Sequence, residues 1–267
     1  MPREILLGDA HTHLDQYPRA EISEILDRAR ESEVLFAACA GTTLQSTQDC
    51  IDLSELHEQL YSGVGIHPME ANAPVDERVY EELERMAKSS SKVVCISEVG
   101  LDYLPGSPDH DTQDQVFREH IRLARSLGLP VIFHSRESHP AVFKLLREEN
   151  AGEVGGAMHY FQGDEATARA AIDCGFYISL ARPLIRLPEL QEVAKVIPLE
   201  NIVLETDAAP QPFKKYRTNW TEPRHLVDIA QTLSELKRID LPEAASITAK
   251  NLTSLLKLNN TDETEDD

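Results

Sequence analysis

The chain is poor in cysteine and has no long apolar run, and each shortage excludes a class of protein. Its four cysteines, Cys39, Cys50, Cys95 and Cys174, form no CxxC pair, so neither a zinc finger nor a disulfide scaffold is indicated. We expect reduced thiols that pack as small apolar side chains. No stretch approaches the ~18 consecutive apolar residues of a membrane helix, and an acidic residue interrupts the N-terminus too early for a signal peptide. These absences predict a cytoplasmic protein with no membrane contact, and no obligate protein partner is evident.

Positive charge is also scarce. The chain has 26 Lys and Arg against 46 Asp and Glu, a net charge of −20 at pH 7, which argues against a broad basic surface for nucleic acid. Part of the excess lies in residues 258–267, which we predict to be a disordered acidic tail. Residues 1–257 are predicted to form one domain. An acidic enzyme can still act on phosphates if bound cations reverse the sign of the charge inside its site.

Apolar runs rich in β-branched residues alternate with segments of helical spacing. The predicted strands are Ile5–His13, Val34–Gly41, Tyr61–His67, Val93–Leu101, Pro130–Ser135, Gly156–Phe161, Gly175–Leu180 and Ile202–Asp207. The predicted helices include Ala20–Glu31, Asp76–Lys88, Asp111–Leu127, Pro140–Glu149, Ala166–Cys174, Pro188–Val196, Glu222–Leu236 and Pro242–Leu256. This alternation indicates a parallel sheet covered by helices, and eight repeats favour a (β/α)₈ TIM barrel. An open doubly wound sheet is the rival fold, but the Gly-rich turn typical of its first strand is absent.

Histidines gather at the ends of the predicted strands. The chain has ten histidines, and five lie at or near strand ends: His11, His13, His67, His134 and His159. In a TIM barrel these ends meet at one face, where the active sites of this fold lie. His11 and His13 are two residues apart on a strand, so both side chains point to the same side and offer two imidazoles to one cation. Taken alone, the pair is equally compatible with two partly exposed loop histidines.

Two carboxylates occupy equivalent positions. Glu98 follows an apolar run, where a carboxylate is costly to bury unless it is paired or bound to metal. Placed between two cations, it would bridge them with one oxygen to each. Asp207 ends the last predicted strand and is a candidate base that takes a proton from the attacking water. The predicted metal ligands are His11, His13, Glu98, His134, His159 and Asp207, and Glu98 and Asp207 are the predicted catalytic residues.

Two further residues are candidates for binding substrate. His67, in Gly65-Ile66-His67-Pro68, could contact the substrate or its leaving group. Arg136 could hold a phosphate oxygen, because a guanidinium group binds phosphate through two parallel hydrogen bonds. A purely structural role is equally compatible with the sequence around each of them.

Six short stretches together carry a resemblance to a known family. They are Asp9-Ala10-His11-Thr12-His13-Leu14-Asp15, Gly65-Ile66-His67-Pro68, Ser97-Glu98-Val99-Gly100-Leu101-Asp102-Tyr103, Val131-Ile132-Phe133-His134-Ser135-Arg136, His159-Tyr160-Phe161-Gln162-Gly163 and Leu204-Glu205-Thr206-Asp207-Ala208. In this order, the chain resembles the TatD-type metal-dependent deoxyribonucleases, within the wider amidohydrolase-like barrels. Each stretch alone is a weak signal, but six in the order of the family are specific.

The resemblance implies a TIM barrel with one or two divalent cations that cleaves phosphodiester bonds in DNA, often from a strand end. It implies one cation among His11, His13, Glu98 and Asp207, and a second among Glu98, His134 and His159. Imidazole ligands suit Zn²⁺, Mn²⁺ or Ni²⁺, whereas Mg²⁺, which the resemblance implies, prefers oxygen ligands. The sequence therefore leaves the metal open among Mg, Mn, Zn and Ni.

The chain also departs from the family pattern. Ser97, Tyr160, Gln162 and Ala209 replace residues that are common in the family, and Ser179-Leu180-Ala181-Arg182 lacks the usual Ser-Gly. None of these changes removes a predicted ligand, but several fall at the expected substrate rim. Two rival hypotheses therefore stay open: an amidohydrolase-type enzyme that cleaves an amide, cyclic amide or ester of a small molecule, and a non-catalytic scaffold that contains metal.

Overall fold

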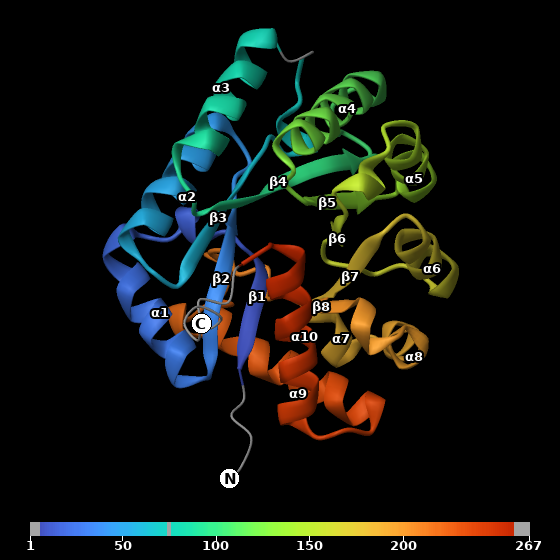
Figure 1. Cartoon of the computed structure of the whole chain (residues 1–267). Helices are drawn as coiled ribbons and strands as arrows, with labels where there is room; N and C mark the ends of the chain where they lie inside the picture. The colour runs from blue at the N-terminus through green and yellow to red at the C-terminus, as the bar shows by residue number, and fades with distance from the viewer. Residues whose placement is uncertain (1–5, 74–75, 259–267) are drawn as a thin grey trace, which may run out of the picture.

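The centre of the fold is an eight-stranded parallel sheet, and the helices lie around it (Figure 1). The computed structural model describes residues 6–73 and 76–258. The strands are β1 Leu7–Thr12, β2 Val34–Ala40, β3 Leu60–Val64, β4 Val93–Asp102, β5 Val131–Arg136, β6 Gly156–Met158, β7 Phe176–Leu180 and β8 Ile202–Leu204. The helices of this part are α1 Ile22–Glu31, α2 Leu44–Leu56, α3 Glu77–Ser89, α4 His110–Leu127, α5 His139–Glu148, α6 Glu165–Asp173, α7 Pro183–Arg186, α8 Pro188–Val196, α9 Leu226–Lys237 and α10 Leu241–Leu255.

The sheet closes on itself. Its strands pair in chain order from β1 to β8, and a parallel bridge joins Thr12 to Ala208 across the last gap. The His13 amide donates to the Ala208 carbonyl at 2.8 Å, and the Asp207 amide donates to the His11 carbonyl at 3.0 Å. The predicted TIM barrel is therefore confirmed, and its seam lies where the first and last motifs meet.

The local sequence of helix α4 explains where this helix begins and ends and which of its faces packs against the sheet. It begins after Asp109, whose carboxylate accepts a hydrogen bond from the Thr112 amide at 2.9 Å, a favourable helix N-cap. It ends at Gly128, which takes φ +67°, a left-handed conformation that glycine adopts at little cost. Phe117 and Ile121, four residues apart on one helix face, are fully buried in the core. The helix therefore covers the sheet with its apolar face.

Helix α10 closes the barrel at the amino ends of the strands. Leu252 and Leu255 pack against a cluster that includes the small residues Ala10 and Ala38 of the barrel wall. The Asn251 side chain donates to the Leu199 and Ile202 carbonyls, where β8 begins. With that end filled, the carboxyl ends of the strands form the open mouth.

Four sequence predictions need correction. The run Tyr61–His67 pairs as a strand only up to Val64. The runs Gly156–Phe161 and Ile202–Asp207 pair only up to Met158 and Leu204. Beyond Met158 and Leu204 the chain turns, with Tyr160 and Asp207 at φ +47° and +51°. Helix α2 was not among the predicted helices, because its many polar residues weaken the apolar periodicity. Its start is nevertheless marked by Thr43, which accepts a hydrogen bond from the Ser46 amide.

The cysteine prediction is confirmed in its main point. All four cysteines are free, and Cys39, Cys50 and Cys95 are buried, whereas Cys174 is only half-buried. In residues 6–73 and 76–258, no helix is long and apolar enough to cross a membrane. Residue 5 of the first predicted strand and residues 259–267 of the predicted acidic tail lie outside the described residues.

Candidate metal centre

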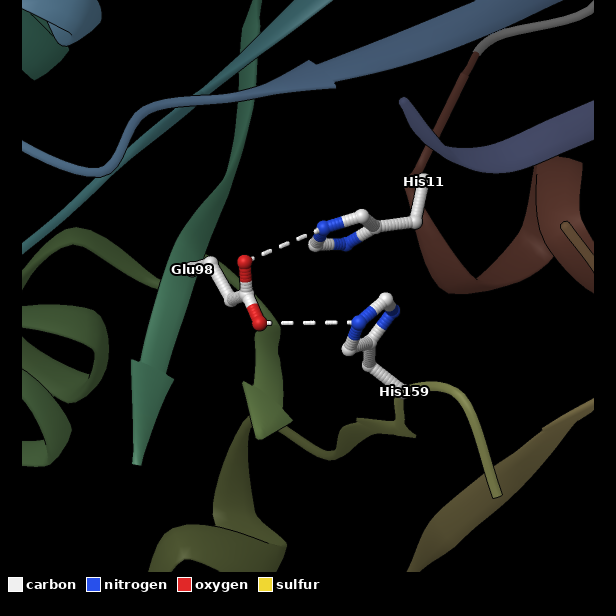
Figure 2. A group of neighbouring side chains, drawn as sticks. All are labelled: His11, Glu98 and His159. Atoms are coloured by element: carbon white, nitrogen blue, oxygen red, sulfur yellow. Dashed lines mark ion pairs between the residues drawn. The ribbon is translucent and has the colours of Figure 1, made fainter. Parts of the chain in front are cut away.

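The barrel mouth brings the predicted site residues together. Glu98 lies at the centre, and its carboxylate is within 3.5 Å of a ring nitrogen of each of five histidines: His11, His13, His67, His134 and His159. Figure 2 shows Glu98 between His11 and His159, with each imidazole paired to a different carboxylate oxygen. Strands distant in sequence therefore contribute to one cluster.

One group of atoms surrounds Oε2 of Glu98. The Nε2 atoms of His11 and His13 lie 3.3 Å apart and are 3.5 and 3.4 Å from that oxygen. Oδ1 of Asp207 is 3.4 Å from Nε2 of His13. Ligand atoms placed ~2.1 Å from a tetrahedral cation are themselves ~3.4 Å apart. These spacings and the N/O donor set are compatible with one divalent cation, and the assignment of these four residues as its ligands stays a prediction.

A second group surrounds Oε1 of the same carboxylate. His134 Nδ1 lies 3.2 Å from that oxygen, and His159 Nε2 lies 3.5 Å from it. His67 Nε2 is 3.4 Å from it as well. His67 was predicted to bind substrate, but the structure places it among the candidate ligands of this second group. The two oxygens of Glu98 thus face two separate sets of imidazoles, the arrangement expected of a bridging carboxylate.

Behind the imidazoles lie carboxylates whose roles the sequence reasoning missed. Asp102 Oδ2 is 3.0 Å from His134 Nε2. Glu205 Oε1 is 2.9 Å from His159 Nδ1, but it lies off the direction of the ring N–H, so this is a close contact rather than an aligned hydrogen bond. Outer carboxylates of this kind orient metal-binding histidines. The available signal was a carboxylate next to an apolar strand, as in Ile202-Val203-Leu204-Glu205.

Asp9, also missed, has a different task. Its side chain is fully buried and accepts a hydrogen bond from the Thr206 amide at 2.9 Å. Its other oxygen accepts from the Thr206 hydroxyl. Asp9 therefore ties the end of β1 to the chain beyond β8, which fixes His11 and His13 relative to Asp207.

Burial and the neighbouring charges set the protonation states of the metal-free centre. Burial would raise the pKa of Asp207, but the hydrogen bond from His13 and the neighbouring imidazoles lower it to about 2. The pKa of Glu98 is likewise held well below its usual range, against burial, by the imidazoles that surround its carboxylate. Burial lowers the pKa of His159 to about 4 and also lowers that of His11. Against burial, neighbouring carboxylates raise the pKa of His13 and raise that of His134 to about 9. Because neutral imidazole is the form that binds metal, a cation must displace a proton from these two rings.

The centre opens into a cavity of about 560 Å³. Arg136 lies at its rim with half of its side chain exposed, and its Nε is 3.0 Å from Asp102 Oδ2. The Ser135 hydroxyl, also in the wall, lies 2.7 Å from His139 Nδ1. Arg136 is thus both anchored and accessible, as a substrate-binding arginine needs to be, while its contact with substrate stays a prediction.

Comparisons with known proteins agree with this picture. The family model described as TatD related DNase matches residues 8–257. The chain is 33% identical to the metal-dependent hydrolase YabD of Bacillus subtilis, over 95% of this chain and 100% of YabD. It is 31% identical to the metal-dependent hydrolase YcfH of Escherichia coli, over 95% of this chain and 97% of YcfH. The crystal structure of YjjV, a TatD homologue from Escherichia coli, superposes with a TM-score of 0.86 at 26% identity, covering 95% of this chain and 98% of YjjV.

Proposed function

The chain belongs to the TatD-related family of metal-dependent hydrolases, and from this premise we propose that it hydrolyses phosphodiester bonds in DNA, beginning at a strand end. The observation that carries the proposal is the position of Glu98, whose two oxygens face two sets of imidazoles. Two cations that share a carboxylate are a recurring arrangement in enzymes that hydrolyse phosphate esters.

Each residue of the centre has a defined task in this reaction. His11, His13 and Asp207 would hold one divalent cation and His67, His134 and His159 the other, with Glu98 between them. When bound, such cations polarise a phosphoryl oxygen and lower the pKa of water. Asp207, ionised and in the cavity wall, accepts the proton of the attacking water. Arg136 at the rim holds a non-bridging phosphate oxygen.

A second candidate function keeps the same centre and changes the substrate. The net charge of −20 disfavours long-range attraction of a polyanion, and this favours a small ester, amide or cyclic amide. An enzyme of that kind would leave DNA intact and hydrolyse members of a small-molecule ester and amide panel.

One assay separates the two candidates. A 5′-labelled single-stranded DNA is incubated with EDTA-treated protein, to which Mg²⁺, Mn²⁺ or Zn²⁺ is added back separately. We expect cleavage only with metal, and its loss in the Asp207→Asn variant. The control is Glu189→Gln, which removes one exposed carboxylate on α8 and should cleave like the unmodified protein. DNA that survives every metal while cations demonstrably bind would overturn the nuclease assignment.

A further inference from the structure

Two of the four free cysteines contact each other outside the metal centre. Cys39 lies on β2 and Cys50 lies on α2, and both side chains are fully buried. The Cys50 thiol donates to Cys39 Sγ at 3.1 Å. Both belong to an apolar cluster formed by residues of β2, β3, α1 and α2. The fold therefore brings together two thiols that form no recognisable motif in the sequence.

A carboxylate points into this pair of thiols. Asp15 lies in the 3₁₀ turn Leu14–Gln16, which follows β1. Its Oδ1 accepts a hydrogen bond from the Cys39 thiol at 3.6 Å, and its Oδ2 accepts one from the Ser46 hydroxyl at 2.7 Å. One ligand atom from each of Asp15, Cys39 and Cys50 lies within 4.8 Å of the other two. We call these three side chains, which come from three elements of the fold, the thiol cluster.

The spacing in the thiol cluster suits a tetrahedral cation. With cation–sulfur and cation–oxygen distances of ~2.3 and ~2.1 Å, tetrahedral geometry places two sulfurs ~3.8 Å apart and a sulfur and an oxygen ~3.6 Å apart. The observed distance from Cys39 Sγ to Asp15 Oδ1 is 3.6 Å. The two sulfurs would need to separate by ~0.7 Å, which a small rotation of each side chain supplies. Water can fill the fourth position, because Asp15 is only half-buried.

Exchange of protons for a cation leaves the charge of the thiol cluster unchanged. Burial raises the pKa of the Cys50 thiol well above its usual range, so this thiol is protonated at pH 7 and is a poor target for oxidants. A divalent cation that binds both sulfurs displaces one proton from each thiol to solvent. Because two positive charges replace two others, the cation adds no net charge to the buried cluster, which limits the cost of desolvation.

We propose that Asp15, Cys39 and Cys50 form a separate site for one thiophilic divalent cation of the Zn²⁺ type. The proposal does not depend on the proposed function. Thiolate ligands select soft or borderline cations, and two sulfurs distinguish this site from the imidazoles of the metal centre. Asp15 follows His13 by two positions, and Cys39 pairs in register with Thr12 of β1. A cation in the thiol cluster would therefore fix the end of β1 against β2 and α2.

Titration with cadmium tests the site through its sulfur ligands. EDTA-treated, fully reduced protein is titrated with Cd²⁺, and the ultraviolet charge-transfer absorption of cadmium–thiolate bonds is recorded. Imidazoles and carboxylates give no such band, so the metal centre does not contribute to it. We expect a band that saturates when one cation fills the thiol cluster. The Cys39→Ala/Cys50→Ala variant should show no band and should release about two protons fewer, one for each missing thiol.

Matched variants keep the two thiols and change other groups. Cys95→Ala/Cys174→Ala removes the other two thiols, of which Cys95 is buried in a different cluster beside α10, and it should keep the whole band. Asp15→Asn keeps both sulfurs of the cluster, so its band should remain. Its Kd for Cd²⁺, measured on that band, should rise at least ~10-fold, since loss of even an outer partner of a metal ligand costs that factor. Circular dichroism and thermal unfolding check that each variant folds.

Zinc tests the effect of the site on the fold. With Mn²⁺ saturating the metal centre, added Zn²⁺ should raise the Tm of the unmodified protein more than that of Cys39→Ala/Cys50→Ala. Displacement of Mn²⁺ from the centre affects both proteins, so it cancels in the comparison.

Three outcomes would overturn the site. They are a band that persists in the Cys39→Ala/Cys50→Ala variant, a Kd that Asp15→Asn leaves unchanged, and the absence of any band in the reduced, unmodified protein. The last of these requires no variant, so the proposal is refutable even if the double variant fails to fold. Cleavage of DNA, or its absence, has no bearing on any of these measurements.

Discussion

Replacing Glu205 with glutamine tests how the protein supports the cation beside His159. Glu205 is fully buried, and its carboxyl also contacts the Ser179 hydroxyl and the Tyr160 amide, the latter at 2.8 Å. Burial raises its pKa to about 8, so the group is mostly protonated at pH 7 when no cation is bound. Glutamine imitates that neutral form. We therefore expect the free energy of unfolding of the metal-free protein to change by less than ~1 kcal/mol.

The metal-bound protein should respond quite differently. A cation on Nε2 of His159 makes the ring more positive, which favours the ionised form of Glu205, only 2.9 Å away, and releases its proton. Glutamine cannot ionise, so the variant loses this stabilisation. Loss of such an outer partner lowers metal affinity about 10- to 100-fold, or ~1.4 to 2.7 kcal/mol. The cation held by His11, His13 and Asp207 should be affected much less.

Calorimetric titration of Mn²⁺ into EDTA-treated protein measures both effects. Repeating it in two buffers of different ionisation enthalpy counts the protons released, and the Glu205→Gln variant should release fewer. Asp102→Asn should lower the affinity for the same cation by a smaller factor, because the charge of Arg136 already offsets part of the charge of Asp102. Glu189→Gln on α8 serves as the neutral control. An affinity within threefold of the unmodified protein, or a strongly destabilised metal-free variant, would refute this reasoning.

Three other predictions concern the reaction, the cation and pH. Asp207→Asn should lower kcat on a phosphodiester by about 10²- to 10⁴-fold without unfolding the protein, and near-normal turnover would remove Asp207 from the mechanism. Cation at 100 times its Kd should stabilise the EDTA-treated protein by ~2.7 kcal/mol, seen as a rise in Tm; an unchanged Tm would contradict a folded-state site. Burial lowers the pKa of His120 from 6.5 to about 4, so its contribution to stability is present above pH 6.5 and is lost as the pH falls toward 4. Between pH 7.5 and 5, urea unfolding should show the unmodified protein losing ~2 kcal/mol more than His120→Gln, and parallel losses would disprove the assignment.

Much of the candidate site follows from the pattern of strands. A polar residue at the end of an apolar run lies at the barrel mouth, because the parallel strands all end at that face. This rule located His11, His13, Glu98, His134 and Asp207. It also located His67, but it could not distinguish a ligand from a substrate contact, since both lie at the same height on the barrel.

The carboxylates behind the ligands were missed for a different reason. Asp9 and Glu205 lie within or directly after apolar strands, yet their partners are Thr206, about 200 positions away, and His159. A sequence shows that a carboxylate is buried but not which distant group compensates for it.

The sequence by itself determined the eightfold alternation, the barrel and the histidines and carboxylates at its mouth, because strand and helix periodicities are local properties of the chain. Only the tertiary structure decided which of those side chains contact one another. It placed the two oxygens of Glu98 against separate sets of imidazoles, and it brought the Asp9 carboxylate to the Thr206 amide. Contacts of this kind depend on barrel closure and on loop paths, which join residues far apart in the chain and leave no spacing from which they could be read.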